Sequence, residues 1–530
     1  MDDHAPSLTP RQRIVALAST LAQRDRLMIG ASTAALALYA LTPWHALALL
    51  PLATYAALTW LRLDVALCLL PLAFPFWFVP KPVVGHLVFP LSEIALGVCA
   101  AVAAARLARA VWAAKAEHAG KWAQTVAAWR DRVLAEFGWP LLAGIGLFVL
   151  GATLGLLAAV QPHEALRAYR WEIVEPLLYL ALLVGFARGE KALRRTVWAL
   201  LASAGVVAAL AVIQVAHWPM VFTPLAQGNH LVPLARGSDG AYRATGIVYG
   251  SANSLGAYLE RALPLALTLL LLVPRSRSGR VWHAWTERAA AGAICLLALV
   301  ALVWSDSRGA WAGALAGGAV VVCLAFGRLQ LLAALAAAGA VAAFALRGPL
   351  LAAALGGHGG TCELRTLVWL AAWHMIRDHP LLGIGLDQFL YHYSTLYTNH
   401  PYWITTLNGQ ATQVWREPTL SHPHNLILDL WLSVGLLGLL GFALIVWTLG
   451  RRGVHVWRAG RQRSPDANVT DSAAWTVVVA VGVAGSVLAS LVHGMVDSAY
   501  FVPDLALVFW WSVALVWLAG RACAATNTSS

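Results

Sequence analysis

A histidine in the stretch Ser421-His-Pro-His-Asn425 is the first candidate for proton transfer in this 530-residue chain. Pro423 suits the first turn of a helix, where a missing N–H costs nothing. We therefore expect His424 in the first turn of the apolar segment that follows. The helix dipole disfavours imidazolium there, so the ring stays neutral and able to accept a proton. Such a ring suits a general base that activates a hydroxyl, and the alternative is a helix cap or interface residue.

A second group of candidates lies between Thr361 and Asp378, where Arg365, Trp369 and Ile376 recur at helical spacing. Thr361 suits the N-cap of this helix. A guanidinium one turn from an indole can hold a pyrophosphate or stack on a sugar. The alternative is a structural cation–π pair beneath a loop.

Two further arginines stand where apolar runs begin or turn. Arg243 opens Arg243-Ala-Thr-Gly-Ile-Val-Tyr-Gly-Ser-Ala-Asn253, where an outer loop re-enters the membrane. It reaches either a ligand at the outer leaflet or the lipid headgroups. Arg308 follows Asp306 and Ser307, which suit a helix cap. A cation at the positive end of a helix favours a bound anion nearby, and a local Asp306–Arg308 pair is the alternative.

Several polar residues are predicted to support these candidates. His493 and Asp497 stand one helical turn apart at the outer end of a span, as supporting partners of the site or as a simple hydrogen-bonded pair. Asp429 stands one turn into the helix after His424 and needs a partner, for which an active-site arginine is possible. The predicted supporting residues are Trp369, Asn425, His422, Asp429, His493 and Asp497.

The elements that must position these residues are transmembrane helices. The chain is 60% hydrophobic and 12% charged, whereas soluble domains are about half apolar and a quarter charged. Apolar runs of roughly 20 residues predict an all-α polytopic membrane protein with about 14 transmembrane helices. One long, partly helical loop outside the membrane is expected over residues 347–423. The predicted spans centre near residues 35, 53, 71, 97, 150, 180, 206, 262, 297, 317, 338, 437, 483 and 512. Because further apolar spans follow the first apolar run, that run is expected to be a transmembrane helix and not a cleaved signal peptide.

The distribution of charge predicts the orientation. With the N-terminus inside and the spans alternating, 26 of the 37 Lys and Arg residues fall in cytoplasmic segments, which is the bias that orients membrane proteins. Both termini are therefore expected to be cytoplasmic, and the long loop faces outward. The net charge of +12 is explained by this bias and by anionic lipid, and no nucleic-acid module is evident. The six cysteines show no CxxC or His/Cys cluster, so neither a metal nor a cofactor is expected.

The order and spacing of these motifs resemble the O-antigen ligase and polymerase superfamily of bacterial membrane proteins. The matching pieces run from about residue 240 to residue 445. They are Arg243-x-x-Gly with Asn253, Ser307-Arg308-Gly-Ala-Trp, Arg365-x-x-x-Trp369, His379-Pro-Leu-Leu-Gly-Ile-Gly-Leu386, and His424-Asn with Gly435-Leu-x-Gly438.

The resemblance implies a metal-independent glycosyltransferase at the periplasmic face of the bacterial inner membrane. The donor is an undecaprenyl-diphosphate-linked glycan, and a hydroxyl of an acceptor glycan, expected to be lipid A–core, attacks its anomeric carbon. His424 maps onto the general base of the family, and Arg243, Arg308 and Arg365 map onto arginines that stabilise the diphosphate.

Three other functions stay open: a polymerase whose acceptor is another lipid-linked repeat, a protein O-oligosaccharyltransferase, and a transporter. The chain divides into N-terminal helices (1–240), a catalytic core (241–449) and a C-terminal part (450–530). The segment 106–132 and the first four helices have no assigned role.

Overall fold

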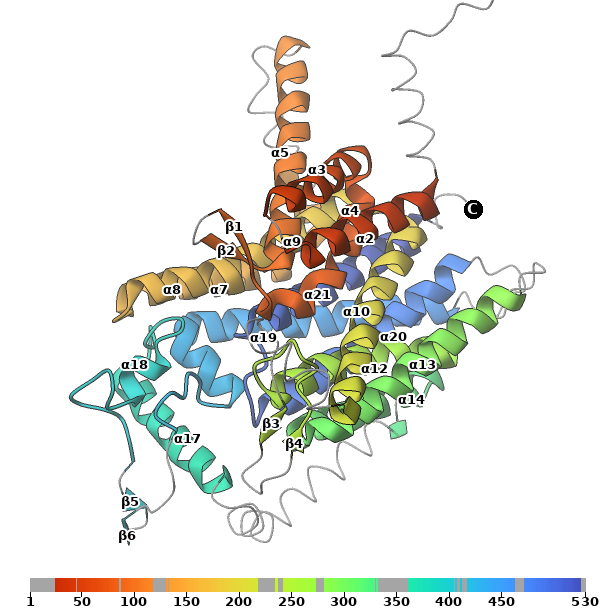
Figure 1. The fold of residues 1–530 in the computed structure, drawn as a ribbon. Helices are drawn as coiled ribbons and strands as arrows, with labels where there is room; N and C mark the ends of the chain where they lie inside the picture. Colours follow the sequence, from red (N-terminus) through yellow and green to blue (C-terminus); the bar gives the residue numbers. More distant parts are fainter. Residues whose placement is uncertain are drawn as a thin grey trace, which may run out of the picture.

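The computed structural model describes residues 24–43, 45–84, 87–117, 130–131, 133–217, 234–236, 242–272, 281–328, 330–331, 361–404, 406–407, 410–411, 417–462 and 471–525. Most of these residues are helical (Figure 1), because a helix satisfies its own backbone hydrogen bonds where no water is present. The helices before residue 220 are α2 (Asp25–Leu41), α3 (His45–Leu61), α4 (Leu63–Leu69), the 3₁₀ helix η1 (Leu70–Phe78), α5 (Leu91–Glu117), α7 (Trp139–Ala158), α8 (Pro162–Tyr169), the π-helix η2 (Arg170–Val174), α9 (Glu175–Phe186) and α10 (Gly189–His217).

The second half of the chain continues with α12 (Ala252–Leu272), α13 (Val281–Ser305), α14 (Arg308–Ala325), α17 (Thr361–Asp378), α18 (Phe389–Tyr393), α19 (Leu426–Gln462), α20 (Asp471–Gly494) and α21 (Pro503–Ala525). Three short antiparallel pairs complete the described part: β1 (Lys81–Val84) with β2 (Leu87–Phe89), β3 (Ala235–Arg236) with β4 (Tyr242–Arg243), and β5 (Thr406–Leu407) with β6 (Gln410–Ala411). The predicted all-α architecture and the helical part of the long loop are therefore present.

Nine helices of the described residues are long and apolar enough to cross a membrane. They coincide with the predicted centres at 97, 150, 206, 262, 297, 317, 437, 483 and 512. The segments Ala46–Leu61 and Leu63–Phe78 are bent by 120° and cover the centres at 53 and 71. Two shorter helices, α2 and α9, cover those at 35 and 180, and the centre at 338 lies outside the described residues. The count of fourteen stays a prediction.

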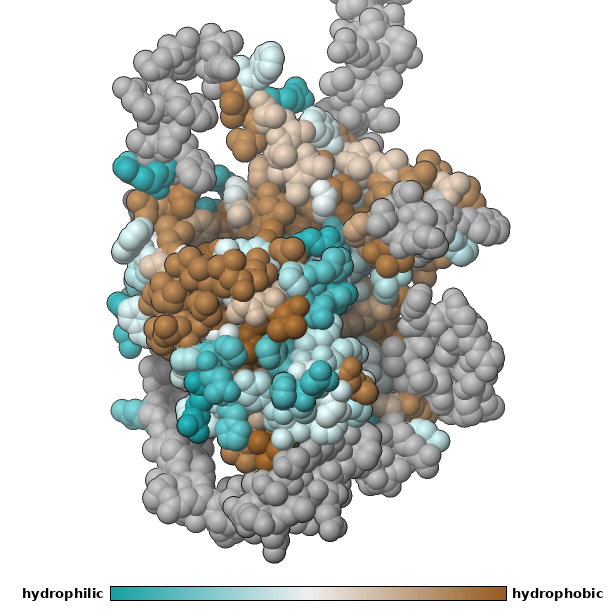
Figure 2. Space-filling model, turned by 90° about the vertical axis from the view of Figure 1, so that its left-hand side faces the viewer, coloured by the Kyte–Doolittle hydropathy of each residue, from teal (hydrophilic) through white to brown (hydrophobic). Residues whose placement is uncertain are grey.

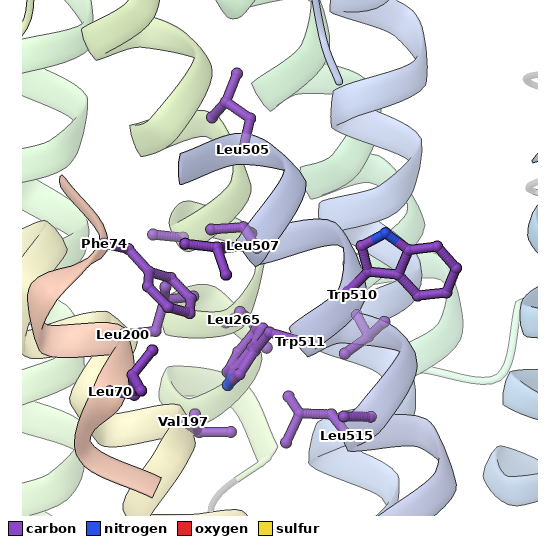
Figure 3. Packing of buried hydrophobic residues seen from close by; sticks show 14 of the residues in the cluster. Leu70, Phe74, Val197, Leu200, Leu265, Leu505, Leu507, Trp510, Trp511 and Leu515 are labelled. Carbon is purple, nitrogen blue, oxygen red and sulfur yellow. The ribbon is translucent and has the colours of Figure 1, made fainter. Parts of the chain in front are cut away.

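The last helix, α21, lies at the centre of the apolar core. Trp510 and Trp511 are fully buried in it, and the cluster around them includes Phe74 of η1, Val197 of α10 and Leu265 of α12 (Figure 3). Both indole N–H groups find acceptors: that of Trp510 donates to the Tyr500 hydroxyl at 2.8 Å, and that of Trp511 to the Thr196 hydroxyl at 2.8 Å. These bonds remove the cost of burying a polar N–H.

The first part of α19 is broken at Gly435, where the chain segment 381–385 packs against its backbone. Gly435 has φ +67° and ψ −177°, and the N–H of Leu436 donates to the carbonyl of Leu381 at 3.0 Å. The N–H of Ile384 donates to the carbonyl of Leu432 at 2.8 Å. Gly383, at φ +67°, has no room for a Cβ, which would lie 2.2 Å from the same Leu432 oxygen. The motif Gly383-Ile-Gly385 therefore satisfies backbone groups that the break exposes.

Ion pairs join helix ends that the charge bias places in the cytoplasm. Arg62, between α3 and α4, contacts Asp25 of α2 at 3.0 Å and Asp64 at 2.7 Å. Arg194, near the start of α10, pairs with Glu287 of α13. The helix packing and the predicted orientation thus agree on which ends lie together.

The other end of the molecule carries α8, α17 and α18 (left and lower left in Figure 1). Figure 2 looks onto this side and shows polar side chains gathered in its middle beside apolar patches. Gln388, just before α18, accepts a hydrogen bond at 2.7 Å from the backbone N–H of Gln161, just before α8. This polar end holds the predicted site residues.

Candidate functional site

His424 lies in the turn before α19 and not in its first turn, which corrects the expectation from Pro423. Asn425 is the residue that caps the helix, because its Oδ1 accepts the N–H groups of Ile427 at 3.1 Å and Leu428 at 3.2 Å. His424 has φ +50°, a conformation that non-glycine residues rarely adopt. Local strain of this kind is found where a side chain must be aimed at a site.

The ring of His424 is held by Asp497, from the turn between α20 and α21. Nδ1 of His424 lies 2.7 Å from Oδ1 of Asp497, and the two side chains are 25% and 11% exposed. The same Oδ1 accepts the N–H of Ser498 at 2.8 Å. In the neutral ring the proton therefore sits on Nδ1, which donates to the carboxylate, and the lone pair sits on Nε2.

The pair also decides how the two groups titrate. Burial lowers the pKa of His424, but the hydrogen bond and charge of Asp497 outweigh burial and raise it above its usual value. Burial would raise the pKa of Asp497, but His424 lowers it well below its usual range. The expectation that the helix dipole keeps His424 neutral is therefore wrong, because His424 precedes the helix and the neighbouring carboxylate favours the charged ring.

Behind Asp497 lies a second layer of buried charge. His493 Nε2 is 3.8 Å from Asp497 Oδ2, too far for a hydrogen bond, so the two do not form the simple pair considered from the sequence. Nδ1 of His493 instead lies 3.1 Å from Oε2 of Glu260 on α12. His493 is 3% exposed and Glu260 is fully buried. Arg261 follows Glu260 and donates to the Ser490 hydroxyl at 2.7 Å.

Helix α17 carries Arg365 and Trp369 one turn apart, as their spacing predicted, and brings Trp369 to this site. The indole N–H of Trp369 donates to the backbone carbonyl of His424 at 3.3 Å. The charge of Arg365, one turn earlier on the helix, acts on both members of the pair and lowers the pKa of His424 and of Asp497. The positive charge of Arg365 therefore acts on the ring that would accept the proton.

Arg243 forms a corner between β4, α12 and the end of α13. It donates from Nε to the carbonyl of Ser305 at 2.8 Å, and from Nη2 to Oδ1 of Asn253 at 2.8 Å and the carbonyl of Asp306 at 3.1 Å. The spacing of Arg243 and Asn253 in the motif is therefore explained by a direct contact. Ordering this turn is part of the role of Arg243, beside any ligand it meets.

Arg308 is the first residue of α14, and its side chain is exposed. The described residues show no ion pair between Asp306 and Arg308, so the local pair considered from the sequence is absent. Ser307 is the N-cap of α14, as the sequence suggested, but its side chain makes no cap hydrogen bond. The next residue, Gly309, packs against His493, since a Cβ there would lie 2.4 Å from its ring. Arg308 is thereby placed at the helix end that touches the second layer.

The remaining supporting residues lie close to the pair. Asp429 accepts the hydroxyl of Ser498 at 3.1 Å, and the Ser433 hydroxyl lies 3.5 Å away, so its partners are serines and not the arginine considered from the sequence. The pKa of His422 is lowered to about 4 by burial and by the charge of His424. His422 is therefore neutral near pH 7 and does not compete for the proton as a cation.

Sequence reasoning missed Glu260 altogether. Its signal was nevertheless present, because a carboxylate within the apolar run 252–272 is costly unless it is paired or functional. Its partner His493 lies more than two hundred residues away, so no local pattern joins them.

Residues 293–443 match the family model described as O-Antigen ligase. A comparison with curated proteins gives no match. The matched region contains Arg308, Arg365, Trp369 and His424, and Asp497 lies beyond it. Its helices belong to a multi-pass membrane fold, as in the glycosyltransferase-like membrane enzymes of this family. The motifs, the helices and the match over residues 293–443 together support a relationship of this chain to the O-antigen ligase superfamily.

Proposed function

We propose that this protein is an O-antigen ligase-like glycosyltransferase that moves a polysaccharide from undecaprenyl diphosphate to a hydroxyl of lipid A–core. The reaction takes place at the periplasmic face of the inner membrane, with both termini in the cytoplasm. The hydroxyl oxygen of the acceptor forms a bond to the anomeric carbon of the donor. The bond from that carbon to the diphosphate oxygen breaks, and undecaprenyl diphosphate leaves with the electron pair.

The single observation that carries the proposal is the 2.7 Å contact between His424 and Asp497. It fixes the tautomer that leaves Nε2 free to take the proton of the acceptor hydroxyl. The carboxylate also stabilises the imidazolium that forms in the transition state. The partly exposed ring stands on the polar end of the molecule, where a glycan in water can reach it.

We assign the arginines of the site to the negatively charged diphosphate of the donor. As the leaving group departs, its charge grows, and preorganised cations stabilise it in the transition state more than in the ground state. Arg365 is the first of these because its charge already acts on the His424–Asp497 pair. Arg308 is exposed at the start of α14, and Arg243 orders the neighbouring corner. Guanidinium groups are suited to this role because they meet phosphate oxygens in a bidentate manner, so no metal is required by the proposal.

The test is an assay of purified protein with an undecaprenyl-diphosphate glycan and either lipid A–core or excess donor, in EDTA. His424→Gln is run beside His374→Gln, a matched exposed histidine on α17. Glycosylated lipid A–core from the wild type and His374→Gln, but not from His424→Gln, supports the proposal.

Each other result has a distinct meaning. Elongated donor as the sole product identifies a polymerase. Full activity of His424→Gln removes this residue as the base. No turnover with either acceptor returns the question to a protein acceptor or to transport.

A further inference from the structure

Two cavities with largely apolar surfaces adjoin each other beside α2, away from the His424–Asp497 pair. The first has a volume of about 730 Å³ and begins among Asp25, Lys191 and Arg194. The second has a volume of about 630 Å³ and reaches Lys81 and Ile247. Thr33 and Leu72 line both cavities, so the two adjoin there. Together they are here called the α2–α10 groove.

The groove has two helical walls and a floor. On α10 the lining residues recur at helical spacing and form one stripe: Lys191, Arg194, Arg195, Trp198, Ala199, Ala202, Ser203, Val206 and Leu210. On α2 the wall includes the small residues Thr33, Ala37 and Ala40. The α4–η1 segment, which packs against α10 and contributes Leu69 and Leu72, forms the floor. Small side chains on one wall leave the width that a chain-like ligand needs.

The length of the groove matches the whole hydrocarbon layer. The α10 stripe from Lys191 to Leu210 covers nineteen residue steps, or about 28 Å at a rise of 1.5 Å per residue. The hydrocarbon core of a bilayer is about 30 Å thick. A phospholipid chain fills only its own leaflet, whereas a long isoprenoid chain can occupy the full length.

The outer end of the groove is joined to the candidate site. Ile247 and Val248 line it, and they follow Arg243 by four and five residues. Ile247 is 2% exposed and has φ +69°, an outlier for a β-branched residue that signals a constrained site. Lys81 also lies at this end, where its ammonium donates to the carbonyl of Thr42 at 2.7 Å. A cation and the two residues that follow the Arg243 corner therefore line the same cavity.

We infer that the α2–α10 groove binds the isoprenoid chain of the lipid-linked donor, with the diphosphate at the end formed by Lys81 and Ile247. The inference rests on the proposed function. Apolar walls of bilayer length fit a single long hydrocarbon chain, and the positive charge at the outer mouth fits the diphosphate that the chain carries. It also gives a role to the first helices, to which no motif assigned one.

The binding test uses two polyprenyl diphosphates without any glycan, each with a photoreactive diazirine. One carries it beside the diphosphate and the other at the far end of the chain. The first is expected to label residues near Val206 and Ile247, and the second residues near Leu69 and Trp198, as mapped by mass spectrometry of peptides. The inference would be overturned if the far-end probe labelled residues outside the groove. It would also be overturned if a photoreactive phospholipid labelled the same residues and unlabelled polyprenyl diphosphate did not compete with the labelling.

The kinetic test fills the groove from either wall with Ala37→Trp and Ala202→Trp. We expect KM for the long-chain donor to rise about tenfold, the loss that follows from removing roughly 55 Å² of apolar contact. For a donor with a short prenyl chain, both variants should have the same KM as the wild type. The control is Leu38→Trp, at an exposed position beside Ala37 that does not line the groove. This substitution should leave KM unchanged for both donors.

These results separate the inference from the proposed function. If KM rises equally for the long-chain and short-chain donors in Ala37→Trp and Ala202→Trp, the groove does not bind the isoprenoid chain. Failure of the wild type to transfer glycan from any donor refutes the function, and the labelling pattern still decides whether the groove binds the isoprenoid chain.

Discussion

Replacing Asp497 by Asn tests the site most directly, because it removes the charge that holds His424 and changes little in volume. Oδ1 of Asp497 lies 2.7 Å from Nδ1 of His424. An asparagine amide can donate to Nδ1, which places the ring proton on Nε2 and removes the base. It also removes the carboxylate that stabilises the imidazolium.

The size of the effect follows from that contact. A hydrogen bond to a charged group contributes about 1.5–3 kcal/mol, and each 1.36 kcal/mol in the barrier is a factor of ten in rate. We therefore expect kcat to fall about 10- to 150-fold. KM for the donor should change little, since the interaction strengthens only as the proton moves.

The pH dependence gives a readout that a merely structural role would not produce. Asp497 raises the pKa of His424 above its usual value, so in the wild type the neutral base is lost as pH falls through this raised pKa. In Asp497→Asn, burial and the charge of Arg365 lower this pKa, and the acid limb of kcat/KM should move to lower pH.

The matched control is Asp378→Asn. Asp378 is exposed on α17 and accepts the hydroxyl of Tyr402 at 2.9 Å, so its loss should leave the limb in place. Rates are measured from pH 5 to 9 with saturating and limiting donor. An acid limb that stays fixed or moves to higher pH in Asp497→Asn would refute the reasoning.

Three further predictions concern the supporting structure. Arg365→Ala should lower kcat/KM for the donor about 10- to 150-fold through loss of a charge-assisted bond to the diphosphate. Arg365→Lys should partly restore kcat/KM. Arg377→Ala, at an exposed position at the other end of α17, should change it little. Asn425→Ala should cost about 1 kcal/mol of stability through loss of the α19 cap, seen as a lower thermal midpoint in detergent; an unchanged midpoint would contradict the assignment. Gly383→Ala should destabilise by at least about 1 kcal/mol, because φ is +67° and a Cβ would meet a backbone oxygen, whereas Gly146→Ala in α7 has open space and should be neutral or stabilising by the same assay.

The sequence predicted the class of protein and the surroundings of the site because both depend on local patterns. Apolar runs of sufficient length indicate spans wherever they occur, and nine predicted centres coincide with long apolar helices. Helical spacing placed Arg365 and Trp369 on one helix, and the family match covers residues 293–443 of the region from about 240 to 445 that the motifs indicated. The start of α19 was predicted one turn too early, since Pro423 suits either a helix start or the turn before a cap.

Only the tertiary structure decided which partners the polar residues have. Asp497 is 73 residues from His424 and pairs with it rather than with His493, and Glu260 reaches His493 from α12. The α2–α10 groove likewise joins elements that are far apart in the chain. Periodicity reports the environment of each residue along its own helix, but it carries no information about which helix lies opposite. That choice is made by packing, which places a buried charge beside whichever group lowers the cost of removing it from water.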